Sequence, residues 1–323
     1  MTVEGLSCYT GNLAAYLEQY DEDAAGRIAR SIRVAVRPGS PDGPLAVSHH
    51  AVPLHRLPGG GELRYRGAPD RDTALREIAA ELDTYGQVLV VGNSSCLPWA
   101  SGAAAAPHFL LVNEQEDGRW HVVDRFMALL PEGGEQEPFE GWLEDAAFAG
   151  ILDPICPLQP QQRLRNEHAF GFPVPLPPEG SYQWLVRVDS DPGRQAALPG
   201  HWTDRPGAAL DLLADWFTSG EQSAVLLADA WAIARHHIYR YENLLGHSAD
   251  DGIREAATRA LSSWQQLPQV LRFAYESAQR GRGRPSLIKT AFGQLSETED
   301  ALIQPLAAAG YGVGATIRQE NNR

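Results

Sequence analysis

Three residues of this chain, Cys8, His108 and Asp124, have the side chains needed for nucleophilic catalysis. A cysteine attacks as its thiolate, and the positive end of a helix dipole favours that anion when the cysteine stands at a helix N-terminus. An imidazole within hydrogen-bond reach completes the activation, and a carboxylate on the other ring nitrogen fixes the tautomer. The surrounding sequence must therefore supply a helix start and two neighbouring strands.

The segment around Cys8 predicts a helix that runs to about residue 20. Its apolar residues recur at three- and four-residue spacings, the period of a helix with one buried face: Leu13, Ala14, Leu17 and Tyr20. Ser7 could cap this helix, and the acidic run at 21–23 would end it. Cys8 is thus expected at the helix N-terminus.

His108 and Asp124 belong to the clearest hairpin of the sequence. Two predicted strands, at 108–113 and 120–124, are joined by a turn at Asp117-Gly118. Antiparallel pairing brings the start of one strand close to the end of the next, so we expect His108 and Asp124 at the same end of the sheet. His121, in the second strand, is the alternative base.

The remaining chain predicts an α+β fold with a helical C-terminal part. Residues 71–86 have helical period, and two further segments, 87–93 and 181–190, predict strands. Residues 130–180 are rich in proline and are expected to be irregular, with a helical piece at 140–150. Beyond a boundary near residue 205, four stretches predict helices, at 207–217, 221–246, 251–280 and 296–310. The expected division is a core at 1–135, a proline-rich connection with a returning strand at 136–204, and an α-helical domain at 205–323.

Composition limits the classes of function. The chain has 323 residues, more than the roughly 250–300 at which single cores stop growing, and 43% of them are hydrophobic. A net charge of −14 argues against nucleic acid or an anionic membrane as the main partner. No apolar run is long enough to span a membrane, and the start of the chain does not resemble a signal peptide, so we expect a cytoplasmic protein with reduced cysteines.

The histidines and cysteines do not predict a metal site. Three cysteines are too few for a disulfide framework or a structural zinc site. The group His49, His50 and His55 lacks further residues at ligand spacing, so a solvated loop or a substrate contact is the better interpretation. His236 and His237 are adjacent on a predicted helix and cannot share a face, so we expect surface or partly buried histidines there.

Four motifs together resemble the butirosin biosynthesis protein H-like family: LSCYTGNLAAYL at 6–17, QVLVVGNSSCLPWA at 87–100, PHFLLVNEQEDGRWHVVDRF at 107–126 and ARHHIYRYENLL at 234–245. The resemblance implies a papain-like cysteine-peptidase-type domain followed by an α-helical domain. It also implies acyl transfer in natural-product biosynthesis, in which an acyl or aminoacyl group passes from a carrier-protein thioester to the cysteine and then to a small-molecule amine. Cys8 would be the nucleophile, His108 the base and then the acid, and Asp124 the residue that orients the imidazole. No metal or diffusible cofactor is implied.

The chain departs from the family pattern at the oxyanion-binding group. Papain-like proteases commonly carry a glutamine six residues before the cysteine, and Thr2 stands there instead. The backbone N–H groups of Cys8 and Tyr9, or the side chain of Asn12 or Asn93, would replace it. We also expect Trp99, from the Leu-Pro-aromatic step, beside the substrate.

Two other functions use the same residues. A thioesterase or a cyclase would use the same Cys-His-Asp triad with water or an internal nucleophile as the acceptor. A non-catalytic binding protein would keep the fold with Cys8 merely buried. The basic run at 280–285 predicts an exposed loop, with docking of an acidic acyl carrier protein as the alternative.

Overall fold

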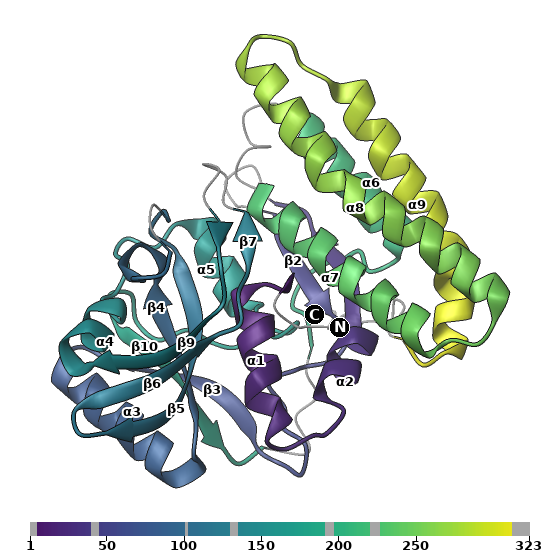
Figure 1. The fold of residues 1–323 in the computed structure, drawn as a ribbon. Helices are drawn as coiled ribbons and strands as arrows, with labels where there is room; N and C mark the ends of the chain where they lie inside the picture. The colour runs from purple at the N-terminus through teal and green to yellow at the C-terminus, as the bar shows by residue number, and fades with distance from the viewer. Residues whose placement is uncertain are drawn as a thin grey trace. The chain divides into compact units, whose positions relative to one another are not determined.

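The computed structural model describes residues 5–39, 45–100, 103–129, 135–190, 197–219 and 227–311. Helices and antiparallel sheets make up an α+β fold (Figure 1). The chain divides into two compact units, each built from separate segments. The sheet unit comprises 2–25 and 54–195, and the helical unit comprises 26–53 and 196–323. This division differs from the predicted one, because residues 26–53 group with the C-terminal helices.

The sheet unit is built on an antiparallel sheet. Among the described residues, six strands pair in the order β3-β10-β4-β5-β6-β9. Their bounds are Glu62–Ala68 (β3), Val88–Asn93 (β4), Pro107–Glu116 (β5), Arg119–Asp124 (β6), Phe139–Glu144 (β9) and Tyr182–Val188 (β10). A short pair, β7 (Ala128–Leu129) with β8 (Glu135–Gln136), follows β6 in the chain.

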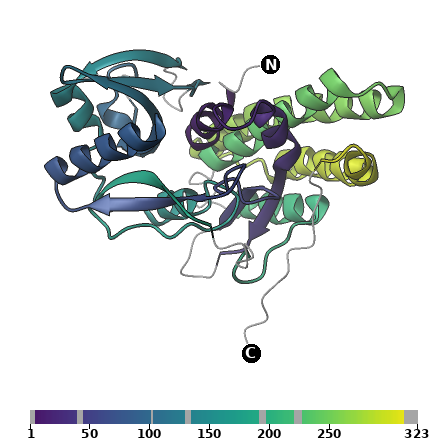
Figure 2. The ribbon, with the colours of Figure 1, turned by 90° about the horizontal axis from the view of Figure 1, so that it is seen from below.

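Helices cover this sheet: α1 (Cys8–Glu18), α3 (Arg71–Tyr85), α4 (Asp145–Ile151) and α5 (Pro160–Glu167). The sheet curves around α3, as Figure 2 shows. Ile78 of α3 and Phe148 of α4 share a buried core with alternate residues of β4 and β5, among them Val90 and Leu110. Helix α1 packs mainly on β5 and also touches β4 and β6. The sheet therefore carries the helix of Cys8 directly beside the strands of His108 and Asp124.

The predicted hairpin is present as β5 and β6. Asp117 (φ 49°) and Gly118 (φ 74°) are both left-handed at its turn, the conformation that an Asp-Gly pair favours in a two-residue hairpin. Helix α3 also agrees with its prediction. The Asp70 carboxylate caps it by accepting a hydrogen bond from the Thr73 backbone N–H at 2.9 Å, and Gly86 ends it with a φ of 75°.

Several elements differ from the sequence-based expectation. Residues 139–144 form strand β9, although a helical piece was expected from residue 140, and the helix α4 begins only at Asp145. Phe139, Gly141 and Leu143 alternate with Glu140, Trp142 and Glu144 in burial, which is the period of a strand. Helix α9 begins at Pro285, eleven residues before its expected start, with proline in the first turn where it is tolerated.

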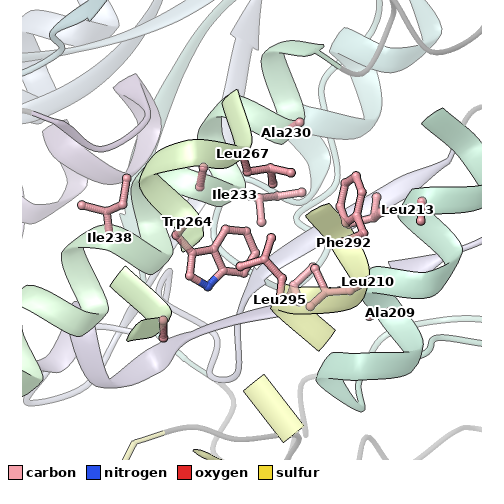
Figure 3. Packing of buried hydrophobic residues seen from close by; sticks show 14 of the residues in the cluster. Ala209, Leu210, Leu213, Ala230, Ile233, Ile238, Trp264, Leu267, Phe292 and Leu295 are labelled. Atoms are coloured by element: carbon pink, nitrogen blue, oxygen red, sulfur yellow. The ribbon is translucent and has the colours of Figure 1, made fainter. Parts of the chain in front are cut away.

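Over its described residues, the helical unit combines a pair of antiparallel strands with four long helices. Its elements are β1 (Ile32–Arg37), β2 (Ala46–His50), α6 (Pro206–Thr218), α7 (Leu227–His247), α8 (Asp251–Gln279) and α9 (Pro285–Ala308). Helix α2 (Ala24–Ser31) leads from the sheet unit into β1. Helices α6, α7, α8 and α9 enclose a core whose side chains, including Trp264, Ile233 and Phe292, interlock in Figure 3.

The structure contradicts the exposure predicted for the two pairs of adjacent histidines. His49 and His50 lie in β2, His236 and His237 lie in α7, and all four are at most 3% exposed. The rings of His49 and His236 stack with their centroids 4.8 Å apart. Burial lowers the pKa of His236 to about 4, so its imidazole is neutral at physiological pH. Packing of β2 against α7 buries these residues. No local sequence pattern indicates this burial.

The described residues hold neither a membrane-spanning helix nor a cluster of metal-ligating side chains. None of the described helices is both long enough and apolar enough to cross a membrane. The described residues also contain no group of three or more histidine, cysteine, aspartate or glutamate side chains placed to hold a metal ion.

Candidate active site

Cys8 is the first residue of α1, and Ser7 is the N-cap. The Ser7 hydroxyl does not cap the helix backbone. It donates instead to the Thr10 hydroxyl at 3.1 Å. The Cys8 side chain is partly exposed, and its thiol lies close enough to the imidazole of His108 to raise the pKa of that ring through charge attraction and hydrogen bonding. The structure thus places the thiol at the positive end of an eleven-residue helix and in contact with a base.

His108 lies near the start of β5 and Asp124 ends β6. His108 Nε2 lies 2.9 Å from Asp124 Oδ2, and the two side chains are 4% and 0% exposed. With Nε2 paired to the carboxylate, Nδ1 is the ring nitrogen that this contact does not use. The hairpin therefore brings His108 and Asp124 together at one end of the sheet, the arrangement that strand order predicted.

Charge in this cluster favours the imidazolium form of His108. Burial alone would lower the pKa of His108, but the attraction of Asp124 and Cys8, with a hydrogen bond to each, raises it to about 10. The ring is consequently protonated at neutral pH. A protonated ring between a carboxylate and a thiol stabilises the thiolate, which is the nucleophilic form.

Asp124 is held by a dense set of donors. Oδ2 accepts hydrogen bonds from the Trp99 indole at 2.9 Å and the Gln136 amide at 3.0 Å, in addition to His108. Oδ1 accepts from the Phe126 backbone N–H at 3.0 Å and the Asn12 amide at 3.3 Å. Burial opposes ionisation, yet His108 and these hydrogen bonds lower the pKa of Asp124. The carboxylate therefore stays charged and its orientation is fixed.

Asn12 was expected to bind an oxyanion through its side chain and Tyr9 through its backbone N–H, and both side chains contact protein groups. The Asn12 amide nitrogen donates to Asp124 and to the Phe109 carbonyl at 2.6 Å, which uses both of its hydrogens. The Tyr9 ring is 3% exposed and packs edge-on against Phe109. In this arrangement Asn12 supports the triad residues and has no hydrogen left to donate to an oxyanion.

Asn93 and Trp99 also bind protein groups. Asn93 caps a turn of 3₁₀ helix (Ser94–Cys96), accepting from the Ser95 backbone N–H at 3.1 Å and the Ser95 hydroxyl at 2.8 Å. Trp99 stacks on Phe139 with ring centroids 3.9 Å apart while its indole donates to Asp124. Trp99 thus contacts the carboxylate of the candidate triad. Thr2, which stands at the position of the family's glutamine, lies outside the described residues.

The alternative base has other partners. His121 Nδ1 lies 2.7 Å from Asn113 Oδ1, and its ring meets the edge of Trp142. Of the two imidazoles in the hairpin, the one in contact with Cys8 is His108. The other two cysteines, Cys96 and Cys156, are exposed.

Some residues of this site were missed by the sequence analysis. Gln136 contributes a hydrogen bond to Asp124 from β8, and Phe126 places its ring edge-on to His108 with centroids 5.3 Å apart. Burial raises the pKa of Tyr65 in β3, and its coupling to Cys8 adds to the shift, which places the phenol within electrostatic range of the thiol. Only tertiary contacts bring these residues together, so no spacing in the sequence could have indicated them.

The arrangement can perform acyl transfer through a covalent thioester. It has a thiol at a helix start, a charged imidazole as proton donor and a fixed carboxylate.

The basic run at 280–285 lies in an exposed stretch of the helical unit, and its role in docking stays a prediction. Comparison with known proteins found no matching family model and no matching curated protein.

Proposed function

We propose that this chain is a cysteine-dependent acyltransferase of papain-like fold, which moves an acyl or aminoacyl group from a carrier-protein-type thioester to an amine. The observation that carries the proposal is the chain of contacts from Cys8 through His108 to Asp124. The resemblance of four motifs to the butirosin biosynthesis protein H-like family supports a role in natural-product biosynthesis. The donor would be an acyl carrier protein and the acceptor a small-molecule amine.

The first half-reaction is a thioester exchange. The Cys8 thiolate attacks the carbonyl carbon of the donor thioester, a new C–S bond forms, and the bond to the donor sulfur breaks. His108 gives its proton to the departing thiolate, so the donor leaves as a neutral thiol. Because one thioester replaces another, the step is close to isoenergetic and depends mainly on positioning.

The second half-reaction forms the amide. The acceptor amine attacks the acyl-Cys8 carbonyl, the now neutral His108 takes a proton from the amine, and the C–S bond breaks to restore the Cys8 thiolate. Asp124 stabilises the imidazolium that forms again. The backbone N–H of Cys8, at the start of α1, would stabilise the oxyanion in both steps.

Intact-protein mass spectrometry tests this proposal. Wild type and Cys8→Ala would each be incubated with an acyl N-acetylcysteamine thioester and quenched in acid. We expect the wild type to gain the mass of one acyl group and the variant to gain none. Cys96 and Cys156 are exposed and remain in both proteins, so they report any non-specific acylation. An equal mass gain in both proteins would contradict the proposal.

An acceptor assay separates this function from its alternatives. A transferase consumes the acyl-enzyme faster when an amine is added, and an amide appears. A thioesterase releases the free acid at a rate independent of the amine, and a cyclase releases a product with the mass of the acid less water. A binding protein would bind the thioester without any mass gain.

A further inference from the structure

Asn12 connects the three residues of the candidate triad. It lies four residues after Cys8 on α1, so the two side chains share one face of the helix. Asn12 is 0% exposed, and each polar atom of its side chain is hydrogen-bonded to β5 or to the end of β6. A buried amide with all of its partners satisfied is a rigid connection between elements.

The partners of Asn12 are the immediate neighbours of the chemistry. Its amide nitrogen donates to the carbonyl of Phe109, the residue after His108, at 2.6 Å, and to Asp124 Oδ1 at 3.3 Å. Its amide oxygen accepts the backbone N–H of Arg125, the residue after Asp124, at 2.9 Å. One side chain therefore fixes the helix of the nucleophile against both the base and the carboxylate.

We propose that Asn12 is the positioning residue that sets the distance between the Cys8 thiol and the His108 imidazole. The inference rests on the proposed function, because it assigns Asn12 a part in activating that thiol. A displacement of about 1 Å in such a contact can lower a rate about 100-fold, so a rigid link beside the thiol has a direct chemical effect. The role differs from oxyanion binding, since Asn12 acts only through the protein groups it holds.

Few side chains can replace Asn12 in this place. Aspartate has nearly the same shape, but it lacks the amide hydrogens and would set a second carboxylate against Asp124 Oδ1. Alanine removes all of the hydrogen bonds and leaves the Phe109 carbonyl and the Arg125 N–H without this partner. Both changes would loosen α1 at the turn that follows Cys8.

Gln87 offers a matched control. Its buried amide donates to the Tyr16 carbonyl at 2.6 Å and so fastens the same helix to the start of β4, two turns away from the thiol. Gln87→Ala removes a buried amide hydrogen bond of the same length as the bond from Asn12 to Phe109, but it touches neither His108 nor Asp124. A merely structural role for Asn12 predicts the same behaviour for both variants.

The experiment measures how fast iodoacetamide alkylates Cys8 as a function of pH. Cys96 and Cys156, which are exposed, would be changed to serine in all proteins. The titratable groups that interact with the thiol are His108 from β5 and Tyr65 from β3, and Asp124 from β6 is paired with His108. Iodoacetamide reacts with the thiolate form, so the alkylation rate across the pH range reports how closely the charged His108 ring is held beside Cys8.

The inference predicts that Asn12→Ala and Asn12→Asp lower the alkylation rate at pH of about 6 by about tenfold or more relative to the rate at pH of about 9. Gln87→Ala should keep the wild-type profile even where it lowers the melting temperature. An unchanged profile in either folded Asn12 variant, or an equal change in Gln87→Ala, would overturn the inference and leave the proposed function standing. A wild-type protein with the profile of an ordinary thiol would instead overturn both.

Discussion

His108 and Asp124 form a buried ion pair, with Nε2 of the ring 2.9 Å from Oδ2 of the carboxylate. The pair lies at the open end of the β5–β6 hairpin. Because α1 packs on these strands, both side chains lie beside the N-terminus of α1. Further donors fix the orientation of the Asp124 carboxylate. The His108 ring therefore lies between a fixed carboxylate and the Cys8 thiol.

The ion pair predicts a specific dependence of stability on pH. The pKa of His108 rises on folding from 6.5 to about 10, so between these values the folded protein keeps a proton that the unfolded chain has lost. The contribution of His108 is therefore complete below pH 6.5 and is lost as the pH rises through about 10. Asp124, whose pKa falls below 3.8, contributes above that pH and loses its contribution as the pH falls further.

Melting temperatures of wild type and His108→Gln across this range check the prediction. The wild type should be the more stable protein by the largest margin near a pH of about 5, and the margin should shrink towards a pH of about 9. His121→Gln, the same change in the neighbouring strand, controls for the general effect of losing a histidine. A margin for His108→Gln that is independent of pH would show that the ring does not titrate with this shift.

Asp124→Asn should slow acylation of Cys8 by about 100- to 10,000-fold, the usual range for a residue that supports a general base. The amide keeps the shape of the carboxylate but loses the charge that stabilises the imidazolium. Single-turnover acylation by the thioester measures the effect. Asp117→Asn makes the same change at the hairpin turn, where asparagine tolerates the left-handed φ of 49°, and should leave the rate within about twofold.

Variants of Trp99 and Phe139 should separate the effect of the hydrogen bond to Asp124 on the acylation rate from the effect of ring packing on stability. Trp99→Phe keeps a ring to stack on Phe139 but removes the hydrogen bond to Asp124, which is worth about 1.5–3 kcal/mol for a charged acceptor. We expect acylation to slow by about tenfold or more, and the melting temperature to fall because the buried carboxylate loses a donor. Phe139→Leu should lower the melting temperature and leave the rate nearly unchanged, because it removes the stacking and keeps the indole donor. Equal effects of both variants on rate would contradict this assignment.

The sequence predicts the main parts of the site because they depend on local signals. A cysteine before a helical period places Cys8 at the start of α1. The Asp117-Gly118 turn fixes the hairpin, and antiparallel pairing then brings His108 next to Asp124. Each of these inferences needs only the neighbouring residues and one rule of pairing.

The rest of the site depends on contacts between distant segments. Asn12 and Gln136 are separated by most of the sheet unit in sequence, yet both bind Asp124. Nothing in the local pattern distinguishes their amides from surface amides. The buried histidines of β2 and α7 were mispredicted for the same reason, since only packing of one element on another removes them from water.

Glu299 of α9 is a buried acid of the helical unit, at 1% exposure. Its Oε1 accepts hydrogen bonds from the Tyr241 hydroxyl and the Trp264 indole, each at 2.7 Å, and lies 3.2 Å from His237 Nδ1. Burial opposes its ionisation, but His237, the charge of Arg240 and these contacts lower the pKa of Glu299 to about 2. The carboxylate therefore joins α7, α8 and α9 as a charged acceptor.

Glu299→Ala should destabilise the helical unit by about 3–5 kcal/mol, because it leaves two buried donors without their acceptor. Urea unfolding followed by tryptophan fluorescence measures the loss, since Trp264 lies at the site. Glu297→Ala, an exposed glutamate in the same helix, should change stability by less than about 0.5 kcal/mol. If the two variants unfold at the same urea concentration, Glu299 does not hold the three helices together, and the network around it is incidental to their packing.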